Sequence, residues 1–422
     1  MARNSKAKNC QIARGLTRRQ LIEVEACVRC GECRLWCPSY AQGQQECITA
    51  MYKLGALRRL IKGSLPEAEK DFFLQGLYKC SACGLCHVVC PVRINTPELW
   101  EQSRQSLSLA GIPQPEGQIK QMSLIKEFNN SYGKPQQERG LWARMAWESG
   151  FLMKPLSLRR EKQTSVLYFA GCTASFDPAM QSVAVQSARL LQEAGIEFSI
   201  LGEEEPCCVS KLRRMGDNDF HEEARKRAEK IIAQGIKTVV VSCAGCYKGL
   251  HSDYKNIWPG VQEVLHLTQF VDRLIQEGRL VLRHKVPMVI TYHDPCHLGR
   301  HTQVYDEPRR ILRAIPGLSL VEMPRHRAFS CCCGMGGGLK IAFPDIQHKM
   351  SASRIREAES TGAQAIVTPC QTCYLGLLTG VDEAGSHINV YHLNELLVRS
   401  VCPDLTREKI ISAFAHPPVG YV

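Results

Sequence analysis

The sequence predicts a mainly α-helical N-terminal domain followed by an α/β region built from two repeated halves. Two observations carry this prediction. Near the N-terminus a run of four cysteines occurs twice, with helical segments between the copies. Farther along, strand patterns alternate with helix patterns, and the same order then returns. We therefore expect a domain over residues 1–105, a helix-containing linker over 106–162, and α/β halves over 163–284 and 285–422.

Composition bounds the class of protein. The chain has 422 residues, of which 44% are hydrophobic and 22% charged, and it contains 22 cysteines. In a chain of this length without an apolar secretory signal, cysteines clustered in short repeated spacings indicate metal binding rather than a disulfide framework. No run of 18 or more apolar residues occurs, so we expect a cytoplasmic protein with no transmembrane segment of its own.

Two cysteine runs near the N-terminus share the spacing C-x2-C-x2-C-x3-C followed by proline, in "CVRCGECRLWCP" and "CSACGLCHVVCP". This is the bacterial ferredoxin pattern for cubane [4Fe–4S] clusters, in which three close cysteines bind one cluster and the fourth crosses to the other. C-x2-C pairs also bind zinc, but four cysteines followed by proline, found twice, argue against zinc. The rule predicts one cluster on Cys27, Cys30, Cys33 and Cys90, and the other on Cys80, Cys83, Cys86 and Cys37.

The segment between the two runs predicts two helices with a break at residues 63–66, where glycine and proline occur. The N-terminal domain is then a helical ferredoxin-like module, whose two clusters form a short path for single electrons. Cys10, Cys47 and Cys402 fit neither run, and isolated cysteines are usually small buried side chains.

The formal net charge of +12 is weak evidence for nucleic-acid binding. That sum counts every cysteine as neutral, whereas cluster ligands are thiolates and an assembled cluster is anionic. Part of the basic excess therefore offsets cluster charge, and we expect no nucleic-acid partner.

Each half of the remaining chain predicts strands that lead to cysteines, with helices between them. The strand patterns are "SVLYFAGC", "EFSIL" and "KTVVVSC" in the first half, and "VPMVITYHDPC", "LSLVEM" and "AQAIVTPCQTC" in the second. The echo continues, because "VLHLTQFV" from Val264 resembles "VYHLNELL" from Val390 at an offset of 126 residues. These repeats indicate a duplication at the scale of a domain.

Spacing decides which of the adjacent Cys331, Cys332 and Cys333 matches the cysteine pair of the first half. In that half 34 residues separate the first cysteine from the pair, and 34 separate the pair from C-x2-C. Choosing Cys332 and Cys333 gives 35 and 36 residues, whereas choosing Cys331 and Cys332 gives 34 and 37, which is less even. The two five-cysteine sets are therefore Cys172, Cys207, Cys208, Cys243 and Cys246, and Cys296, Cys332, Cys333, Cys370 and Cys373, with Cys331 as a bystander.

Both sets lie at the carboxyl ends of predicted strands, where open α/β sheets bind their ligands. Five thiolates are one more than a cubane cluster needs, so an ordinary cubane does not account for either set.

At this point the sequence resembles the cysteine-rich CCG domain proteins, through "YHDPCHLGRH", "CCGMGGGLK" and "TPCQTC". Because the ferredoxin-like module precedes these segments, the chain is similar to the D-type catalytic subunit of heterodisulfide reductase. The resemblance implies two non-cubane [4Fe–4S] clusters, one for each five-cysteine set, facing each other across a disulfide site. Those ten cysteines would then be catalytic, with electrons arriving through the two cubane clusters.

The resemblance also implies partners. A membrane cytochrome b, a c-type cytochrome complex or a flavoprotein would exchange electrons with the chain, which would lie on the inner face of the membrane. Related chains include subunits of glycolate, lactate and glycerol-3-phosphate dehydrogenases. A non-catalytic electron-transfer subunit of a quinone-linked dehydrogenase or a transmembrane redox complex is therefore the second hypothesis, and a zinc-stabilised scaffold is the third.

One departure concerns the first set. Val209 follows its cysteine pair where the second half has Gly334, and valine resists backbone conformations that glycine permits, so we expect a less secure first site. The glycine cluster has no following Gly-Lys-Ser/Thr, which argues against a phosphate loop. Backbone N–H groups turned toward cluster sulfur fit Gly334, Gly336 and Gly337 better.

His293, His297 and His301 recur at four-residue intervals, but Pro295 breaks a helix there. We favour contacts to ligands or substrate over direct metal binding, with a structural role equally open. Four basic residues follow the cysteines and could receive an anionic thiol substrate, although a solvated face is the default interpretation. They are Lys211, Arg213, Arg214 and Arg300.

Overall fold

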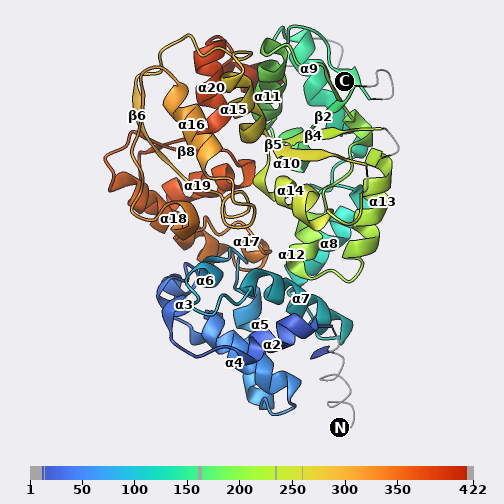
Figure 1. Ribbon diagram of the computed structural model, residues 1–422, viewed down its shortest axis with the longest axis vertical. Helices are drawn as coiled ribbons and strands as arrows, with labels where there is room; N and C mark the ends of the chain where they lie inside the picture. The colour runs from blue at the N-terminus through green and yellow to red at the C-terminus, as the bar shows by residue number, and fades with distance from the viewer. Residues whose placement is uncertain (1–11, 14, 160–163, 233–234, 259, 416–422) are drawn as a thin grey trace.

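The computed structural model describes residues 12–13, 15–159, 164–232, 235–258 and 260–415. A helical N-terminal module lies against two α/β halves that stand side by side (Figure 1). The predicted fold class is confirmed. Cys10 and the predicted boundary at residues 162 and 163 lie outside the described residues. Within the described part of the chain, no helix is long and apolar enough to cross a membrane.

The N-terminal module consists of short helices around an apolar centre that includes Leu57, Leu77 and Trp100. The predicted break between two helices is confirmed, since a turn with Gly63 at φ 72° separates α4 from α5. The helices are α2 (Arg18–Glu25), α3 (Glu32–Leu35), α4 (Ala50–Ile61), α5 (Glu67–Tyr78), α6 (Leu85–Val88) and α7 (Thr96–Leu109).

The first half has a parallel sheet in the order β1-β3-β2-β4-β5. Its edge strand β1 (Ser157–Leu158) and the helices α8 (Glu116–Phe128) and α9 (Leu141–Glu148) come from the predicted linker, and the linker thus extends the sheet of this half. The other strands are β2 (Val166–Phe169), β3 (Phe198–Ile200), β4 (Thr238–Val241) and β5 (Glu263–His266). The other helices are α10 (Gly171–Phe176), α11 (Gln181–Glu193), α12 (Ser210–Met215), α13 (Phe220–Ile232), α14 (Ala244–Lys248) and α15 (Leu267–Gln276).

The second half repeats this topology in the order β7-β6-β8-β9, which corresponds to β3-β2-β4-β5. The duplication is confirmed, and its 126-residue offset relates two helix N-caps, His266 and His392. The strands are β6 (Met288–Tyr292), β7 (Leu318–Leu320), β8 (Ala365–Thr368) and β9 (Asn389–His392). The helices are α16 (Asp306–Ala314), α17 (Leu339–Ala342), α18 (Pro344–Glu359), α19 (Gln371–Ala384), α20 (Leu393–Val401) and α21 (Arg407–Ala415).

The two halves share one apolar core. Helices α11 and α20 pack against each other, and buried side chains from both sheets join a single cluster. Within this contact the Asn394 amide donates a hydrogen bond of 2.8 Å to Ser187 Oγ, and both residues are buried. A large apolar interface of this kind holds the halves in one fixed arrangement.

Arg104 of α7 joins all three parts of the molecule. Its fully buried guanidinium donates to the carbonyls of Leu77 and Cys80 in the module, at 2.7 Å each. It also donates to Arg214 O of the first half at 2.6 Å and to Gly337 O of the second half at 2.9 Å. One side chain therefore fixes the module against both halves.

We expect Arg104→Met to destabilise the protein by about 3 kcal/mol or more, because it leaves four buried carbonyls without their charged donor. The measurement is thermal unfolding of the anaerobic protein, followed by circular dichroism. Arg19→Met is the control, since Arg19 is 71% exposed and should change stability by less than about 0.5 kcal/mol. Equal unfolding temperatures for the two variants would contradict the role given to Arg104.

Candidate functional site

Both five-cysteine sets lie where the strand order of their sheet reverses. In the first half Cys172 follows β2 and Cys243 follows β4, which are adjacent parallel strands on either side of the reversal. In the second half Cys296 follows β6 and Cys370 follows β8 in the same way. The carboxyl ends of strands at such a reversal form the crevice in which α/β sheets bind ligands.

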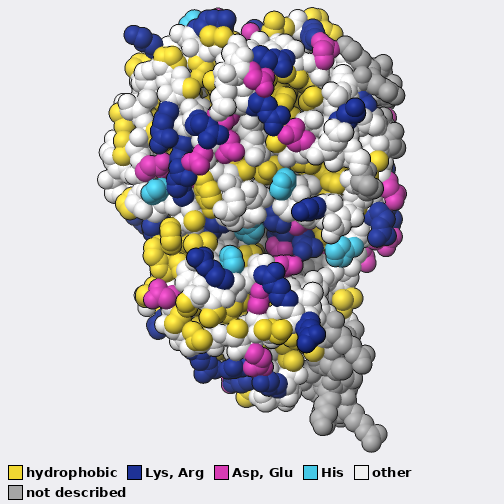
Figure 2. Space-filling model, in the orientation of Figure 1, with side chains coloured by type: hydrophobic (Ala, Val, Ile, Leu, Met, Phe, Trp, Pro, Cys, Tyr) yellow, Lys and Arg dark blue, Asp and Glu magenta, His cyan; other side chains and the backbone are white. Residues whose placement is uncertain are grey.

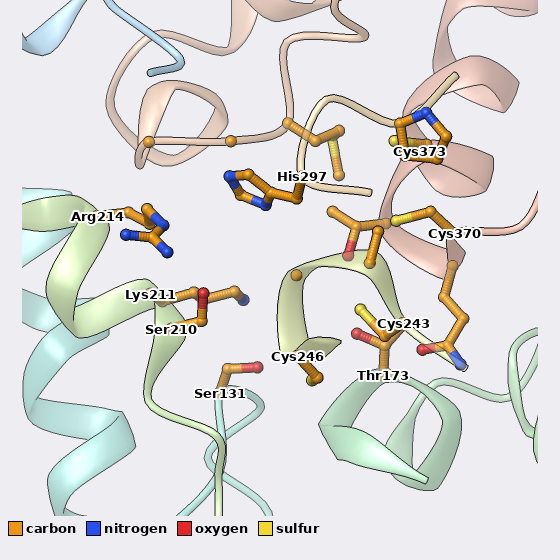
Figure 3. Close-up of a pocket in the computed structure, with 18 of the residues that line it drawn as sticks. Ser131, Thr173, Ser210, Lys211, Arg214, Cys243, Cys246, His297, Cys370 and Cys373 are labelled. Carbon is orange, nitrogen blue, oxygen red and sulfur yellow. The ribbon is translucent and has the colours of Figure 1, made fainter. Parts of the chain in front are cut away.

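The ten predicted cysteines line a single cavity between the two halves. Its empty space, including the open mouth, is about 1150 Å³. Figure 3 shows Cys243 and Cys246 from the first half facing Cys370 and Cys373 from the second. All ten are buried and unpaired by disulfides. The duplication thus converts two distant sequence patterns into one site.

Side-chain interactions link these thiols into a continuous chain. In the first set they connect Cys172 to Cys207, Cys207 to Cys208, and Cys208 to Cys246 and onward to Cys243. In the second set they connect Cys296, Cys332, Cys333, Cys373 and Cys370 in that order, and Cys333 Sγ donates a hydrogen bond of 3.4 Å to Cys373 Sγ. Cys243 and Cys370, equivalent positions in the repeat, also interact and so join the two sets.

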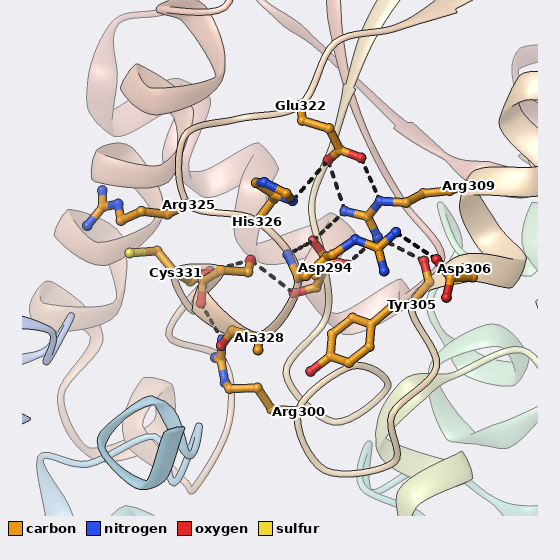
Figure 4. A network of polar contacts seen from close by, with 12 residues as sticks. Asp294, Arg300, Tyr305, Asp306, Arg309, Glu322, Arg325, His326, Ala328 and Cys331 are labelled. Carbon is orange, nitrogen blue, oxygen red and sulfur yellow. Dashed lines mark hydrogen bonds and ion pairs between the residues drawn. The ribbon is translucent and has the colours of Figure 1, made fainter. Parts of the chain in front are cut away.

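Cys331 stands apart from this chain. It is buried, but it does not line the cavity, and Figure 4 shows its sulfur on the side of Arg325. Arg354 and Glu357 also lie close enough to act on its thiol. The same loop is fixed by Asp294, which receives two hydrogen bonds from Arg309 and one from the Arg327 N–H. The geometry therefore favours the pair Cys332 and Cys333 that the spacing selects.

The N-terminal cysteines line two smaller cavities of about 380 and 390 Å³. Cys90 lies with the first run, and Cys37 with the second, which is the crossing that the ferredoxin rule predicts. The first cavity is near the surface, where Cys30 is exposed, whereas Cys83 in the second is buried. Cys86 contributes to the walls of both cavities, so they are neighbours.

The second N-terminal set touches the second five-cysteine set directly, because Cys83 and Cys332 pack in one buried cluster and their side chains interact. Two glycines permit this approach. A Cβ on Gly336 would lie 2.8 Å from Ser81 O, and one on Gly337 would lie 2.6 Å from Cys80 O. Close backbone packing between the module and the second half therefore explains these two glycines better than the predicted contact with cluster sulfur.

Gly334 does direct its backbone toward sulfur. Its N–H donates to Cys332 Sγ at 3.3 Å, and its φ of 80° lies in the left-handed region. Val209 holds the equivalent left-handed conformation, with φ 45°, although this costs a β-branched residue of order 1–3 kcal/mol. Both positions therefore lie in the left-handed region, and Val209 reaches it at a cost that glycine does not have.

The three histidines do not form one stripe, because residues 293–301 form turns rather than a helix. The His297 and His301 rings contact each other, with 5.0 Å between their centres. Arg354 Nε donates to His293 Nδ1 at 3.2 Å, and the His293 ring also lies beside Cys333 and Cys373. A neutral His293 then carries its proton on Nε2, which suits donation to sulfur rather than metal binding. His297 lines the cavity, and burial and the charge of Arg214 lower its pKa to about 3, so it is neutral.

Two of the four basic residues do not lie on the solvent-exposed surface that the sequence suggested. Arg214 is 3% exposed and pairs with Glu101 and Asp253 at 2.5 Å each. Arg300 is buried and donates to Cys83 O at 2.8 Å. The prediction was wrong there because a short basic run does not reveal buried carboxylate or carbonyl acceptors.

Arg213 is partly exposed, at 23%, and lines a polar cleft of about 880 Å³ between the module and the halves, together with His301 and Asp253. Figure 2 shows charged and histidine side chains gathered at this junction. Lys211 alone of the four is well exposed, at the mouth of the main cavity.

Several buried cations lie beside the cysteines, and of these sequence reasoning singled out only Arg300 and missed Arg139, Lys53 and Arg104. Arg139, from the predicted linker, donates to Cys172 Sγ at 2.9 Å and pairs with Glu205. Lys53, Arg104 and Arg300 are buried around the second N-terminal set, and none has a carboxylate partner among the described residues. Burial acts to raise the pKa of Cys80, but the charges of Lys53 and Arg104 outweigh it and lower the pKa.

Unpaired buried cations are costly unless an anion completes the site. Four thiolates and an iron–sulfur cluster together form such an anion, so the residues present fit a cluster in the second N-terminal cavity. A pocket of neutral thiols would leave these charges uncompensated. Periodicity does not identify these residues, because Lys53 and Arg104 occupy helix positions that look like ordinary surface positions in the sequence.

Two family descriptions match the chain. A 4Fe-4S dicluster domain covers residues 23–94, and a cysteine-rich domain covers residues 166–251 and again 290–377. The D-type subunit of the dihydromethanophenazine:CoB–CoM heterodisulfide reductase from Methanosarcina barkeri is 36% identical over 411 residues, which cover 92% of this chain and 96% of the relative. The chain belongs to the family of D-type heterodisulfide reductase subunits.

The chain is also similar to more distant proteins. The EtfAB:quinone oxidoreductase of Syntrophomonas wolfei is 28% identical over 427 residues, covering 91% of this chain and 59% of the relative. The solved structure of a hypothetical protein from Helicobacter pylori shares the fold, with a TM-score of 0.50 and 11% identity over 87% of this chain and 73% of that one. The predicted resemblance is confirmed, and the chain is an iron–sulfur oxidoreductase component of the D-type heterodisulfide reductase family.

We expect Cys333→Ser to lower the iron content of the anaerobically purified protein, because Cys333 contacts two other cysteines of its set. Cys331→Ser is the matched control, with a change of the same size at an adjacent buried position. It should keep wild-type iron and sulfide. Loss of iron in Cys331→Ser with retention in Cys333→Ser would reverse the assignment of the working pair.

Proposed function

We propose that this protein is the catalytic subunit of a disulfide/thiol oxidoreductase, in which a disulfide binds between the two five-cysteine sets. The observation that carries the proposal is the cavity shared by all ten cysteines, five from each half. An electron-transfer subunit needs a path for electrons, but it does not need two complete facing sets around an open space. The reaction breaks one S–S bond, consumes two electrons and two protons, and forms two thiols, or runs in reverse.

The cysteines would hold four clusters. Cubane clusters belong to the two N-terminal sets with the crossing of Cys37 and Cys90, and non-cubane clusters belong to the two five-cysteine sets. When bound, the cubane clusters would carry single electrons and the non-cubane clusters would offer iron to the two sulfurs of a disulfide. The chain of thiol contacts from Cys83 through Cys332 to the first half supports this route.

The substrate that suits the cavity is a small disulfide with anionic groups. Apart from the cysteines, the charged side chains that line the cavity in the described structure are all cations, namely Lys211, Arg214 and Lys340. Lys211 is exposed at the mouth and Lys340 is half-buried, so both can meet an entering anion. His297 faces the same space as a neutral hydrogen-bonding group (Figure 3).

The electron partner would dock at the exposed N-terminal set. Cys30 is exposed, and two neighbouring apolar side chains that line this cavity, Val28 and Val92, are 63% and 44% exposed. Apolar surface around a shallow redox site suits a protein partner. We propose a membrane cytochrome b, a c-type cytochrome complex or a flavoprotein as that partner, and a peripheral position on the inner face of the membrane.

The second candidate is a non-catalytic electron-transfer subunit of a quinone-linked dehydrogenase or a transmembrane redox complex. The similarity to a relative named as an EtfAB:quinone oxidoreductase favours it. In that case the five-cysteine sets would relay electrons, and added thiol would leave their signals unchanged.

One experiment separates the two candidates. The protein is purified anaerobically, and its iron and sulfide are measured together with its EPR spectrum with and without a small thiol after oxidation. The proposal expects about 16 iron atoms per chain and a signal that changes with thiol. About eight iron atoms and no thiol-sensitive signal would leave only the N-terminal electron path.

We expect Lys211→Gln to raise the KM for an anionic disulfide about 5- to 30-fold with little change in kcat, because an exposed charge at the cavity mouth contributes about 1–2 kcal/mol to binding an anion. The assay uses reduced viologen dye as donor. Lys255→Gln, on the exposed surface away from the cavity lining, is the control. A fall in kcat at constant KM would contradict a binding role.

A further inference from the structure

Lys53 is a buried ammonium beside the second N-terminal cysteine set. It comes from α4, is 1% exposed, and its Nζ lies 4.7 Å from the centre of the Trp100 ring. It lines the cavity that holds Cys37, Cys80, Cys83 and Cys86. No carboxylate lies within ion-pair distance of Lys53 among the residues that the structure describes.

The electrostatic effect of Lys53 falls mainly on this second set. Lys53 lines the cavity of the second set, whereas it is not among the residues that line the cavity of the exposed set. A charge held in a dry interior acts strongly on its neighbours, whereas charges near the exposed Cys30 are screened by water.

Reduction adds one negative charge to a cluster. A fixed cation nearby stabilises the reduced form more than the oxidised form, so it raises the reduction potential. Arg104 and Arg300 act in the same sense, but their guanidinium groups are occupied by carbonyls that hold the module against the halves. Lys53 is free of such bonds among the described contacts, so its charge has no comparable structural duty.

We propose that Lys53 raises the reduction potential of the cluster bound by Cys37, Cys80, Cys83 and Cys86 above that of the exposed cluster, and so directs electrons inward to Cys332. This inference rests on the cluster assignment in the proposed function, but it does not depend on which substrate is reduced. Lys53 is a residue that sets a potential and takes no part in bond making.

The test is an EPR-monitored redox titration of the whole protein and of Lys53→Met, which keeps a similar side-chain volume and removes the charge. The equilibrium constant for reducing the buried cubane cluster should fall at least tenfold in Lys53→Met. This corresponds to a decrease of about 59 mV in its midpoint potential for one electron. The exposed cluster should shift less. Lys53→Arg, which keeps the positive charge, should bring the midpoint of the buried cluster most of the way back to the wild-type value. Lys62→Met, a change at a 58% exposed lysine just after the same helix, should leave both midpoints unchanged.

A midpoint in Lys53→Met equal to that of the wild type, at wild-type iron content, would overturn the proposal. If Lys53→Met fails to assemble its clusters, the order of the two midpoint potentials in the wild-type protein still tests the proposal. Cys30→Ser identifies the signal of the exposed set, and that signal must be the lower in potential; if it is the higher, the proposal is wrong. Absence of any cubane signal would instead overturn the proposed function itself.

Discussion

The contact between Cys83 and Cys332 is the constraint on which the rest of the structure depends. It joins a ferredoxin-like cysteine run to a five-cysteine set that lies about 250 residues farther along the chain. Two loops must approach closely to make it, and Gly336 and Gly337 remove the side chains that would prevent the approach. Arg104 and Arg300 then bind carbonyls on both sides of the junction, so the module has one position relative to the halves.

The distribution of buried charge follows from the same constraint. Thiolates and clusters are anionic, and the protein places cations beside the cysteines that would hold them. Arg139 donates to Cys172 in the first five-cysteine set, and Lys53 lies close to Cys80 in the second N-terminal set. Part of the formal charge of +12 is therefore internal, and this explains why a basic chain need not have a basic binding surface for nucleic acid.

The sequence predicts much of this arrangement because cysteine spacing and strand patterns are local signals. The alternation of strands and helices and its repeat follow from the strand and helix patterns, and the choice of Cys332 and Cys333 follows from counting residues between cysteines. The order of the strands within each sheet comes only from the structure. The docking of the module does not, since no local pattern records that Gly337 will meet Cys80. Nor does the burial of Arg104, because its four acceptors are backbone carbonyls, which every residue has.

Val209 shows how firmly the cysteine pairs are specified. Glycine adopts the left-handed conformation without strain. In the second half a further reason favours Gly334, because a Cβ there would lie 3.1 Å from Gln347 Cα. Val209 has the same backbone conformation at a cost, and its side chain is completely buried in an apolar cluster. Burial of that apolar side chain contributes stability that opposes the backbone strain. The left-handed conformation after each cysteine pair therefore has a different physical basis in the two halves. It is the backbone freedom of Gly334 in the second half and the apolar packing of Val209 in the first.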